Sequence, residues 1–165
     1  MKKVEVIVTN EKEGLAKITS YPYRPDKKRY EVPLYKVHVK NVETKHIHEF
    51  KAIRFGVKRT KAKEAHVVGL QDEQEHVLQW NYITTMREMA WRVYSGFFIH
   101  RDSANPLVGF GSIGCVEICG VGEWNRFNTL IKQITECSRE EEVGSKELAK
   151  VIYKKATRPK LKLIP

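Results

Sequence analysis

Cysteine is scarce in this chain: Cys115, Cys119 and Cys137 are the three among 165 residues. An odd and small count argues against a framework of disulfides, and the spacing does not match a zinc site. On one strand, Cys115 and Cys119 would lie about 13 Å apart, too far for a disulfide between them. His46 and His48 would share a strand face, but we expect no ligand set around them. The sequence therefore predicts at least one reduced thiol, with no metal site and no cofactor.

Long apolar runs are also missing. No stretch reaches the roughly 18 residues that a membrane-spanning helix requires, so the sequence predicts no membrane span. Residues 1–10 contain two lysines but lack the uninterrupted apolar core and the cleavage site of a secretory signal. If the protein acts in the periplasm or the cell wall, we expect it to arrive by a route that does not read a signal peptide. Otherwise we expect it in the cytoplasm.

Negative charge is in the minority: 20 aspartates and glutamates stand against 30 lysines and arginines, for a formal net charge of +10. A basic balance suits polyanionic partners such as nucleic acid, anionic lipid or an acidic cell-wall polymer. The positive charges are distributed along the chain, and no basic motif interleaved with aromatics accompanies them. We therefore expect no nucleic-acid partner, and solubility with weak attraction to any anion explains the charge better than a specific polyanionic partner does.

The hydrophobic pattern predicts a single domain over residues 1–165, mainly β with C-terminal helices, which is an α+β fold. Four strands are predicted from alternating or apolar runs, at residues 4–9, 15–21, 34–40 and 50–57. Turn residues at 10–14 predict a hairpin loop, and the polar stretch 58–75 predicts a long loop. Strands at this spacing favour an antiparallel sheet that partly closes into a barrel.

The C-terminal third has helical periodicity. A first helix is predicted from Glu123 onward, because apolar residues recur there at spacings of three or four and would face a core. This apolar stripe consists of Trp124, Phe127, Ile131, Ile134 and Cys137. Ser145 can cap a second predicted helix, which would carry Leu148, Ala149 and Ile152.

One stretch indicates chemistry: an apolar run at residues 96–99 ends in His100, and Cys115 follows after a loop rich in turn residues. A thiol with a pKa of about 8.5 is mostly protonated at neutral pH, and a positioned histidine can take its proton and activate it for acyl transfer. The backbone amides of Gly114 and Cys115 could stabilise an oxyanion, and Ser112 could orient the imidazole. From the residues alone, a buried structural cysteine explains Cys115 equally well.

The order of His100, a glycine-containing loop and the run at residues 112–116 resembles the catalytic signature of the L,D-transpeptidase (YkuD-type) family. The resemblance implies a β-sandwich or a partly closed barrel with few helices. It also implies that Cys115 attacks the L,D-peptide bond of a peptidoglycan stem peptide to form an acyl-enzyme, which an amine or water then resolves. His100 would be the base, and Ser112 and Gly114 would support the loop and the oxyanion hole.

The chain departs from that signature at two positions. Ile113 stands where the family has a second histidine, and Glu117 stands where arginine is common. The resemblance therefore implies a divergent member, such as a cell-wall-targeting effector or lysis toxin, with a secretion apparatus or an immunity protein as partner. Two other functions stay open: a non-enzymatic basic binding domain that keeps the fold, and a cysteine amidase that uses the same pair on another bond of peptidoglycan.

Overall fold

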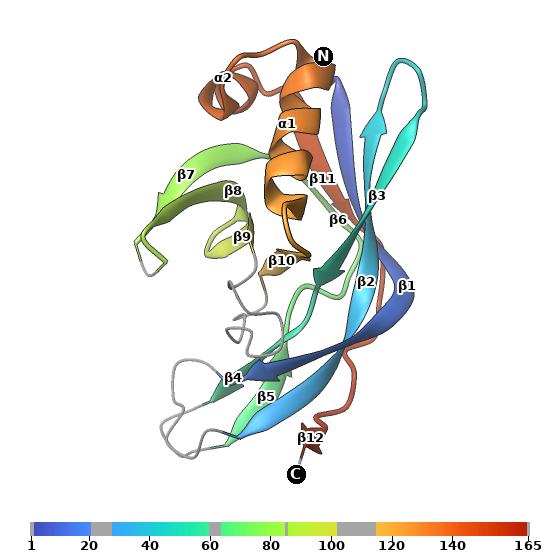
Figure 1. Ribbon diagram of the computed structural model, residues 1–165, viewed down its shortest axis with the longest axis vertical. Coiled ribbons are helices and arrows are strands. Elements are labelled where there is room, and N and C mark those ends of the chain that lie inside the picture. The colour runs from blue at the N-terminus through green and yellow to red at the C-terminus, as the bar shows by residue number, and fades with distance from the viewer. Residues whose placement is uncertain (1, 21–27, 60–63, 85, 102–114, 165) are drawn as a thin grey trace.

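A computed structural model describes residues 2–20, 28–59, 64–84, 86–101 and 115–164 (Figure 1). This part of the chain forms a curved ten-stranded sheet, a small two-stranded sheet and two helices. The prediction of a mainly β fold with a partly closed, barrel-like sheet and C-terminal helices is confirmed. In the described ranges, no helix is long and apolar enough to cross a membrane.

The strands of the first half are β1 (Val4–Thr19), β2 (Arg29–Asn41), β3 (Ile47–Ile53), β4 (Gly56–Arg59), β5 (Ala65–Val68) and β6 (Gln74–Val77). The next four are β7 (Gln79–Ile83), β8 (Glu88–Tyr94), β9 (Phe97–Arg101) and β10 (Val116–Cys119). The chain then forms α1 (Glu123–Thr135), α2 (Glu140–Ser145), β11 (Ala149–Tyr153) and β12 (Leu163–Ile164).

The large sheet is closed by the chain itself. Its strands follow the order β6-β11-β1-β2-β3-β10-β9-β8-β7, and β12 pairs with β2. The strands at the two ends of this order, β6 and β7, are consecutive in sequence and are separated by Leu78 alone. Leu78 is fully buried, and its amide donates to the carbonyl of Ala149 at the start of β11. The sheet therefore wraps almost into a barrel, as its curvature in Figure 1 shows.

Helix α1 lies against the inner side of this sheet (Figure 1). Phe127 and Ile131 are four residues apart, so they share one face of the helix. Both are fully buried in a core that includes strand residues Val39, Ile99 and Ile118. Burying each of the two helix side chains stabilises the fold by roughly 1.5–3 kcal/mol. The helix predicted from Glu123 is thus present, and it holds the two flanks of the curved sheet together.

A buried arginine joins three segments that are distant in sequence. Arg54, directly after β3, is fully buried, and its guanidinium donates to the carbonyls of Thr9 (2.9 Å), Leu70 (3.1 Å) and Lys154. Burial lowers the pKa of Arg54, but a guanidinium whose ordinary value is 12.5 stays charged at neutral pH. The side chain therefore works as a fixed cation that ties β1, the segment before β6 and the end of β11 together.

The prediction of a hairpin loop at residues 10–14 is wrong. β1 runs through this stretch as one long strand, and its pairing with β2 shifts register between Val8 and Lys12 and again between Lys12 and Leu15. Residues 10–12 are exposed, so polar side chains there have the composition of a loop although the backbone stays in the sheet. Gly14 has a φ of 98°, a conformation that favours glycine, and the strand continues beyond it.

The second predicted helix is also wrong. The short helix α2 ends at Ser145, and residues 149–153 form β11, which pairs in parallel with β1. Ala149, Val151 and Tyr153 are buried while the residues between them are half-buried, which is the period of a strand. The long loop predicted at residues 58–75 is wrong as well, since its described part contains β5 and the end of β4, and β6 begins within it.

Candidate functional site

The predicted nucleophile and base lie on neighbouring strands. His100 belongs to β9, and Cys115 directly precedes β10. Strands β9 and β10 pair in parallel, with Val116 opposite Ile99 and Glu117 opposite His100. Cys115 therefore falls beside Phe98, two residues along the ladder from His100. Strand spacings of roughly 3.3 Å per residue and 4.8 Å between strands place the Cα atoms of Cys115 and His100 about 8 Å apart. Ser112 and Gly114, predicted to support the oxyanion hole, lie outside the described residues.

The imidazole of His100 is neutral at physiological pH. The side chain is 4% exposed, and burial lowers its pKa to about 4 despite an opposing hydrogen bond to the backbone. That bond joins Nδ1 to the carbonyl oxygen of Arg101 at 2.7 Å, so Nδ1 carries the proton. Nε2 is then left with a lone pair. The ring has the tautomer that a general base requires.

The thiol of Cys115 is protonated. Its Sγ donates to the carbonyl oxygen of Gly96 at 3.7 Å. Burial raises the pKa of Cys115 to about 11; a backbone hydrogen bond at Phe98 lowers it in part, and the charge of Glu117 raises it further. Within the described residues, no hydrogen bond joins this thiol to the ring of His100. The resting pair therefore consists of two neutral groups and not of a thiolate and an imidazolium.

Glu117 is a buried carboxyl that affects the Cys115 thiol electrostatically. It is buried on β10 between His100 of β9 and Ile53 of β3. A negative charge at this position opposes ionisation of Cys115, whereas an arginine would favour it. Glu117 thus adds to the effect of burial, which is the larger cause of the raised pKa of Cys115.

Two buried tyrosines without a sequence signal belong to the same part of the fold: Tyr153 interacts with Cys115, and both tyrosines lie near Arg54. The hydroxyls of Tyr35 and Tyr153 are buried and have no hydrogen-bond partner among the described residues. Burial raises the pKa of both, and a charge on Cys115 raises that of Tyr153 further, so Tyr153 is an electrostatic neighbour of the thiol. The guanidinium of Arg54 lies 5.6 Å from the ring of Tyr153 and 6.0 Å from that of Tyr35.

This arrangement leaves two phenol donors inside the barrel next to a fixed cation. No motif or spacing marked these tyrosines in the sequence, because Tyr35 is one member of an alternating strand and Tyr153 belongs to the strand that was predicted as a helix. The only available signal was the strand period of residues 149–153.

Metal-ligating side chains are not clustered in the part of the chain that the structure describes. Residues 2–20, 28–59, 64–84, 86–101 and 115–164 contain no group of three or more His, Cys, Asp or Glu side chains that could hold an ion. The rings of His46 and His48 contact each other, with centroids 4.5 Å apart. The pKa of His48 is lowered, mainly by burial and then by the charges of His46 and Arg126.

Comparison of the chain with protein-family models, with curated proteins and with solved structures found no match to any of them.

Proposed function

We propose that the protein is a cysteine acyl-transfer enzyme of L,D-transpeptidase type that acts on peptidoglycan stem peptides. The observation that carries the proposal is the parallel pairing of β9 and β10, which brings His100 and Cys115 from opposite ends of a loop to adjacent strands. The pKa values support it further, since a neutral imidazole can accept a proton from a neutral thiol.

The proposed reaction begins when the Cys115 thiol leaves the carbonyl of Gly96 and turns toward the imidazole. Nε2 of His100 accepts the thiol proton while Sγ attacks the carbonyl carbon of the L,D-peptide bond. The tetrahedral intermediate then collapses, and the imidazolium returns the proton to the departing amine. An acceptor amine or water attacks the thioester with His100 again as base, which releases Cys115 as a thiol.

Proton transfer has to accompany attack in this reaction. Forming the free thiolate at pH 7 from a thiol with a pKa of about 11 costs about 5 kcal/mol. General-base catalysis by His100 removes the need for that separate step. A charge on Cys115 raises the pKa of the buried Tyr153 hydroxyl, so the two groups interact electrostatically, and we assign Tyr153 the role of stabilising charge that develops beside Sγ.

The direct test is a comparison of Cys115→Ala with Cys119→Ala on purified muropeptides, followed by mass spectrometry. Cys119 is the matched control because it lies at the end of the same strand, β10. We expect Cys115→Ala to remove all exchange, cleavage and cross-linking while its circular dichroism spectrum is unchanged. Cys119→Ala should keep activity. Full activity of Cys115→Ala would refute the proposal.

The same products separate an L,D-transpeptidase from a cysteine amidase. Exchange or cross-linking leaves stem peptides with altered fourth residues or new bridges, and a carboxypeptidase reaction leaves tripeptides. An amidase would instead free whole stem peptides from the glycan.

A non-enzymatic binding domain is the second candidate. The observation in its favour is that the Cys115 thiol and the His100 ring each bond to a backbone carbonyl instead of to each other. In that case Cys115→Ala would bind peptidoglycan sacculi as well as the unsubstituted protein does, and neither would change the muropeptides.

The biological setting we propose is delivery to the cell wall as an effector or lysis toxin. Expression with a periplasmic signal should then lyse or deform bacterial cells, and expression without one should not. An immunity protein would be recognised by its ability to suppress that lysis. Equal harmlessness in both compartments would count against a toxin.

A further inference from the structure

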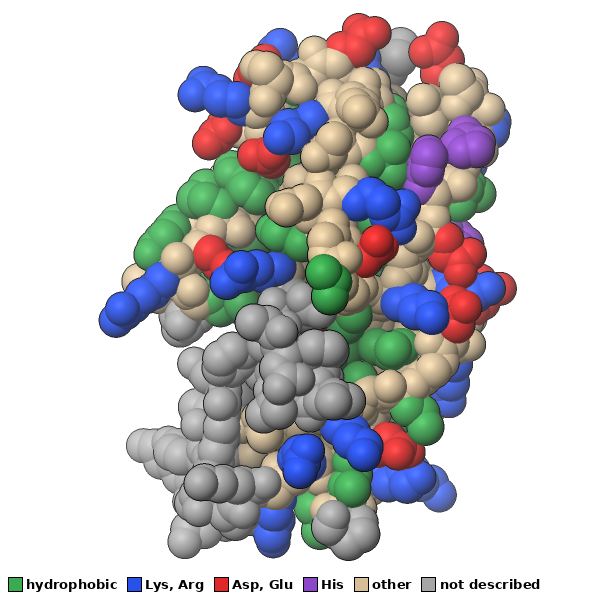
Figure 2. All heavy atoms as spheres, viewed as in Figure 1, with side chains coloured by type: hydrophobic (Ala, Val, Ile, Leu, Met, Phe, Trp, Pro, Cys, Tyr) green, Lys and Arg blue, Asp and Glu red, His purple; other side chains and the backbone are tan. Residues whose placement is uncertain are grey.

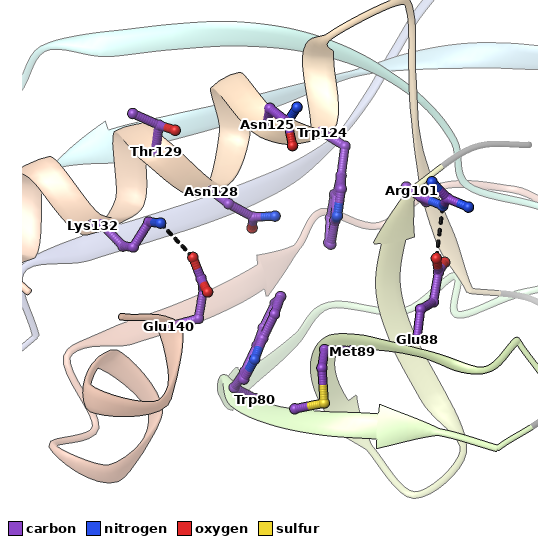
Figure 3. A pocket seen from close by; sticks show the side chains of 10 residues that line it. All are labelled: Trp80, Glu88, Met89, Arg101, Trp124, Asn125, Asn128, Thr129, Lys132 and Glu140. Carbon is purple, nitrogen blue, oxygen red and sulfur yellow. Dashed lines mark ion pairs between the residues drawn. The ribbon is translucent and has the colours of Figure 1, made fainter. Parts of the chain in front are cut away.

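A surface cavity of about 380 Å³ lies between α1, the β7–β8 hairpin and the start of α2 (Figure 3). One wall is aromatic. The rings of Trp80 and Trp124 are nearly parallel, with centroids 6.4 Å apart and an interplanar angle of 18°. Trp80 also contacts Trp91 at 4.7 Å, and Trp124 contacts Phe127 at 5.8 Å. Because both partners are fully buried, the wall is held in place by the core.

The second wall is polar and belongs to α1. Asn125, Asn128 and Thr129 lie within two turns of the helix and all border the cavity (Figure 3). The amide of Asn128 is oriented by the core, since its Oδ1 accepts a hydrogen bond of 2.7 Å from Nε1 of Trp91. Its Nδ2 is then available as a donor. Asn125 and Thr129 are exposed, so both can bind a ligand without losing an internal contact.

The charges around the cavity are balanced. Lys132 pairs with Glu140 at 2.6 Å, and Arg101 pairs with Glu88 at 2.7 Å, on opposite sides of the tryptophans (Figure 3). Two cations and two anions in contact leave no net charge for an ionic ligand. A fixed aromatic wall with amide and hydroxyl groups opposite instead favours a neutral ligand that has one apolar face and several hydroxyls.

We propose that this cavity binds a saccharide chain, with one pyranose ring laid on Trp80 and Trp124. The axial C–H groups of a pyranose form an apolar face, and its hydroxyls can bond to Asn125, Asn128 and Thr129. Single-stranded nucleic acid also stacks on aromatic rings, but it needs unpaired cations for its phosphates. The cations at this cavity are paired, and across the face in Figure 2 basic and acidic side chains are interspersed.

The assignment of this saccharide to peptidoglycan rests on the proposed function. Arg101 borders the cavity and directly follows His100 on β9, so the two side chains point to opposite faces of the same strand end. A glycan strand held at the tryptophans would lie on the opposite face of β9 from the predicted base, and its substituent would pass the end of this strand to reach His100. This position favours the N-acetylhexosamine glycan of peptidoglycan, whose substituent is the stem peptide.

The test measures binding to the full chain by tryptophan fluorescence and by calorimetry, with a tetramer of β-1,4-linked N-acetylglucosamine as the probe. We expect saturable binding, an affinity about tenfold lower in Trp124→Ala, and a severalfold lower affinity in Asn125→Ala, whose exposed side chain is not needed for folding. Tyr82→Ala is the matched control, because Tyr82 is an exposed aromatic on β7 that does not line the cavity.

The outcomes separate this inference from the proposed function. Undiminished binding by Cys115→Ala, with no muropeptide activity in the unsubstituted protein, would support the saccharide site and refute the enzyme. Binding of maltotetraose alone would support a saccharide ligand and overturn its cell-wall source. Three results would overturn the inference. The protein could fail to bind any saccharide at millimolar concentration, or Tyr82→Ala could lose as much affinity as Trp124→Ala. The third is a preference for oligothymidylate that Trp124→Ala abolishes.

Discussion

The protonated state of Cys115 predicts an unusual response to alkylation. Compared with a short cysteine peptide of pKa about 8.5, a thiol with a pKa of about 11 has about 300-fold less thiolate at pH 7. The more basic thiolate is the stronger nucleophile, which offsets about a factor of ten. We therefore expect Cys115 to react with iodoacetamide about 30-fold more slowly than the peptide at pH 7. Limited access to a half-buried thiol lowers the rate further.

The pH dependence is the decisive part of this experiment. Restricted access lowers the rate by the same factor at every pH, whereas protonation makes it rise tenfold per pH unit below the pKa. The tryptic peptide of residues 102–126 contains both Cys115 and Cys119. Fragment-ion mass spectrometry of this peptide assigns the alkylation to Cys115, and sampling between pH 6 and pH 10 gives that slope. The same measurement in urea serves as the control and should approach the rate of the peptide.

A different result would refute the neutral pair. If Cys115 reacted faster than the peptide at pH 6 to 7, and its rate reached a plateau below pH 8, the thiol would already be ionised beside a protonated His100. The catalytic step would then start from a preformed ion pair.

Three further predictions follow from the same buried groups. His100 has a pKa of about 4 in the folded protein and an ordinary value of 6.5, so as the pH falls the unfolded chain is protonated at this residue before the folded chain is. The free energy of unfolding should therefore keep its full value above pH 6.5 and fall by about 3 kcal/mol toward pH 4. In a urea-denaturation series, His100→Gln should flatten this part of the pH dependence. Arg54→Met should destabilise the fold by about 3–5 kcal/mol because three buried carbonyls lose their donor, whereas Arg126→Met, at an exposed arginine, should cost about 1 kcal/mol. Glu117→Gln should move the alkylation profile of Cys115 to lower pH, and an unchanged profile would contradict the assigned effect of its charge.

The sequence predicted that His100 and Cys115 come close together on neighbouring strands, but not how their side chains are oriented. An apolar run ending in His100 and a β-branched run after Cys115 both indicate buried strands, and two such strands joined by a loop have a good chance of pairing. The hydrophobic pattern of the sequence does not indicate how the two side chains are oriented. The bonds of Sγ to Gly96 and of Nδ1 to Arg101 depend on local rotamers and on burial by distant strands, so the raised pKa of one group and the lowered pKa of the other had no sequence signal.

The errors in the fold have a common cause, which is tertiary pairing that overrides local composition. Residues 10–14 are polar and end in glycine, so they resemble a loop; pairing with the long strand β2 nevertheless keeps them in β1. Leu148, Ala149 and Ile152 have a spacing that fits a helix, but alternating burial and parallel pairing with β1 place 149–153 in the sheet. Parallel pairing joins the two ends of the chain, and no local window of sequence contains both partners.

The closure of the sheet at Leu78 has a mechanical consequence for the saccharide cavity. Trp80 lies two residues after this junction. Helix α2 packs closely against its backbone, since a Cβ on Gly144 would lie 3.1 Å from the Trp80 amide nitrogen. A junction of one residue cannot lengthen, so it fixes the circumference of the sheet. The circumference in turn fixes how far Trp80 stands from Trp124 on α1. Lengthening the junction by a residue or two is thus a way to widen the cavity without changing any residue that lines it.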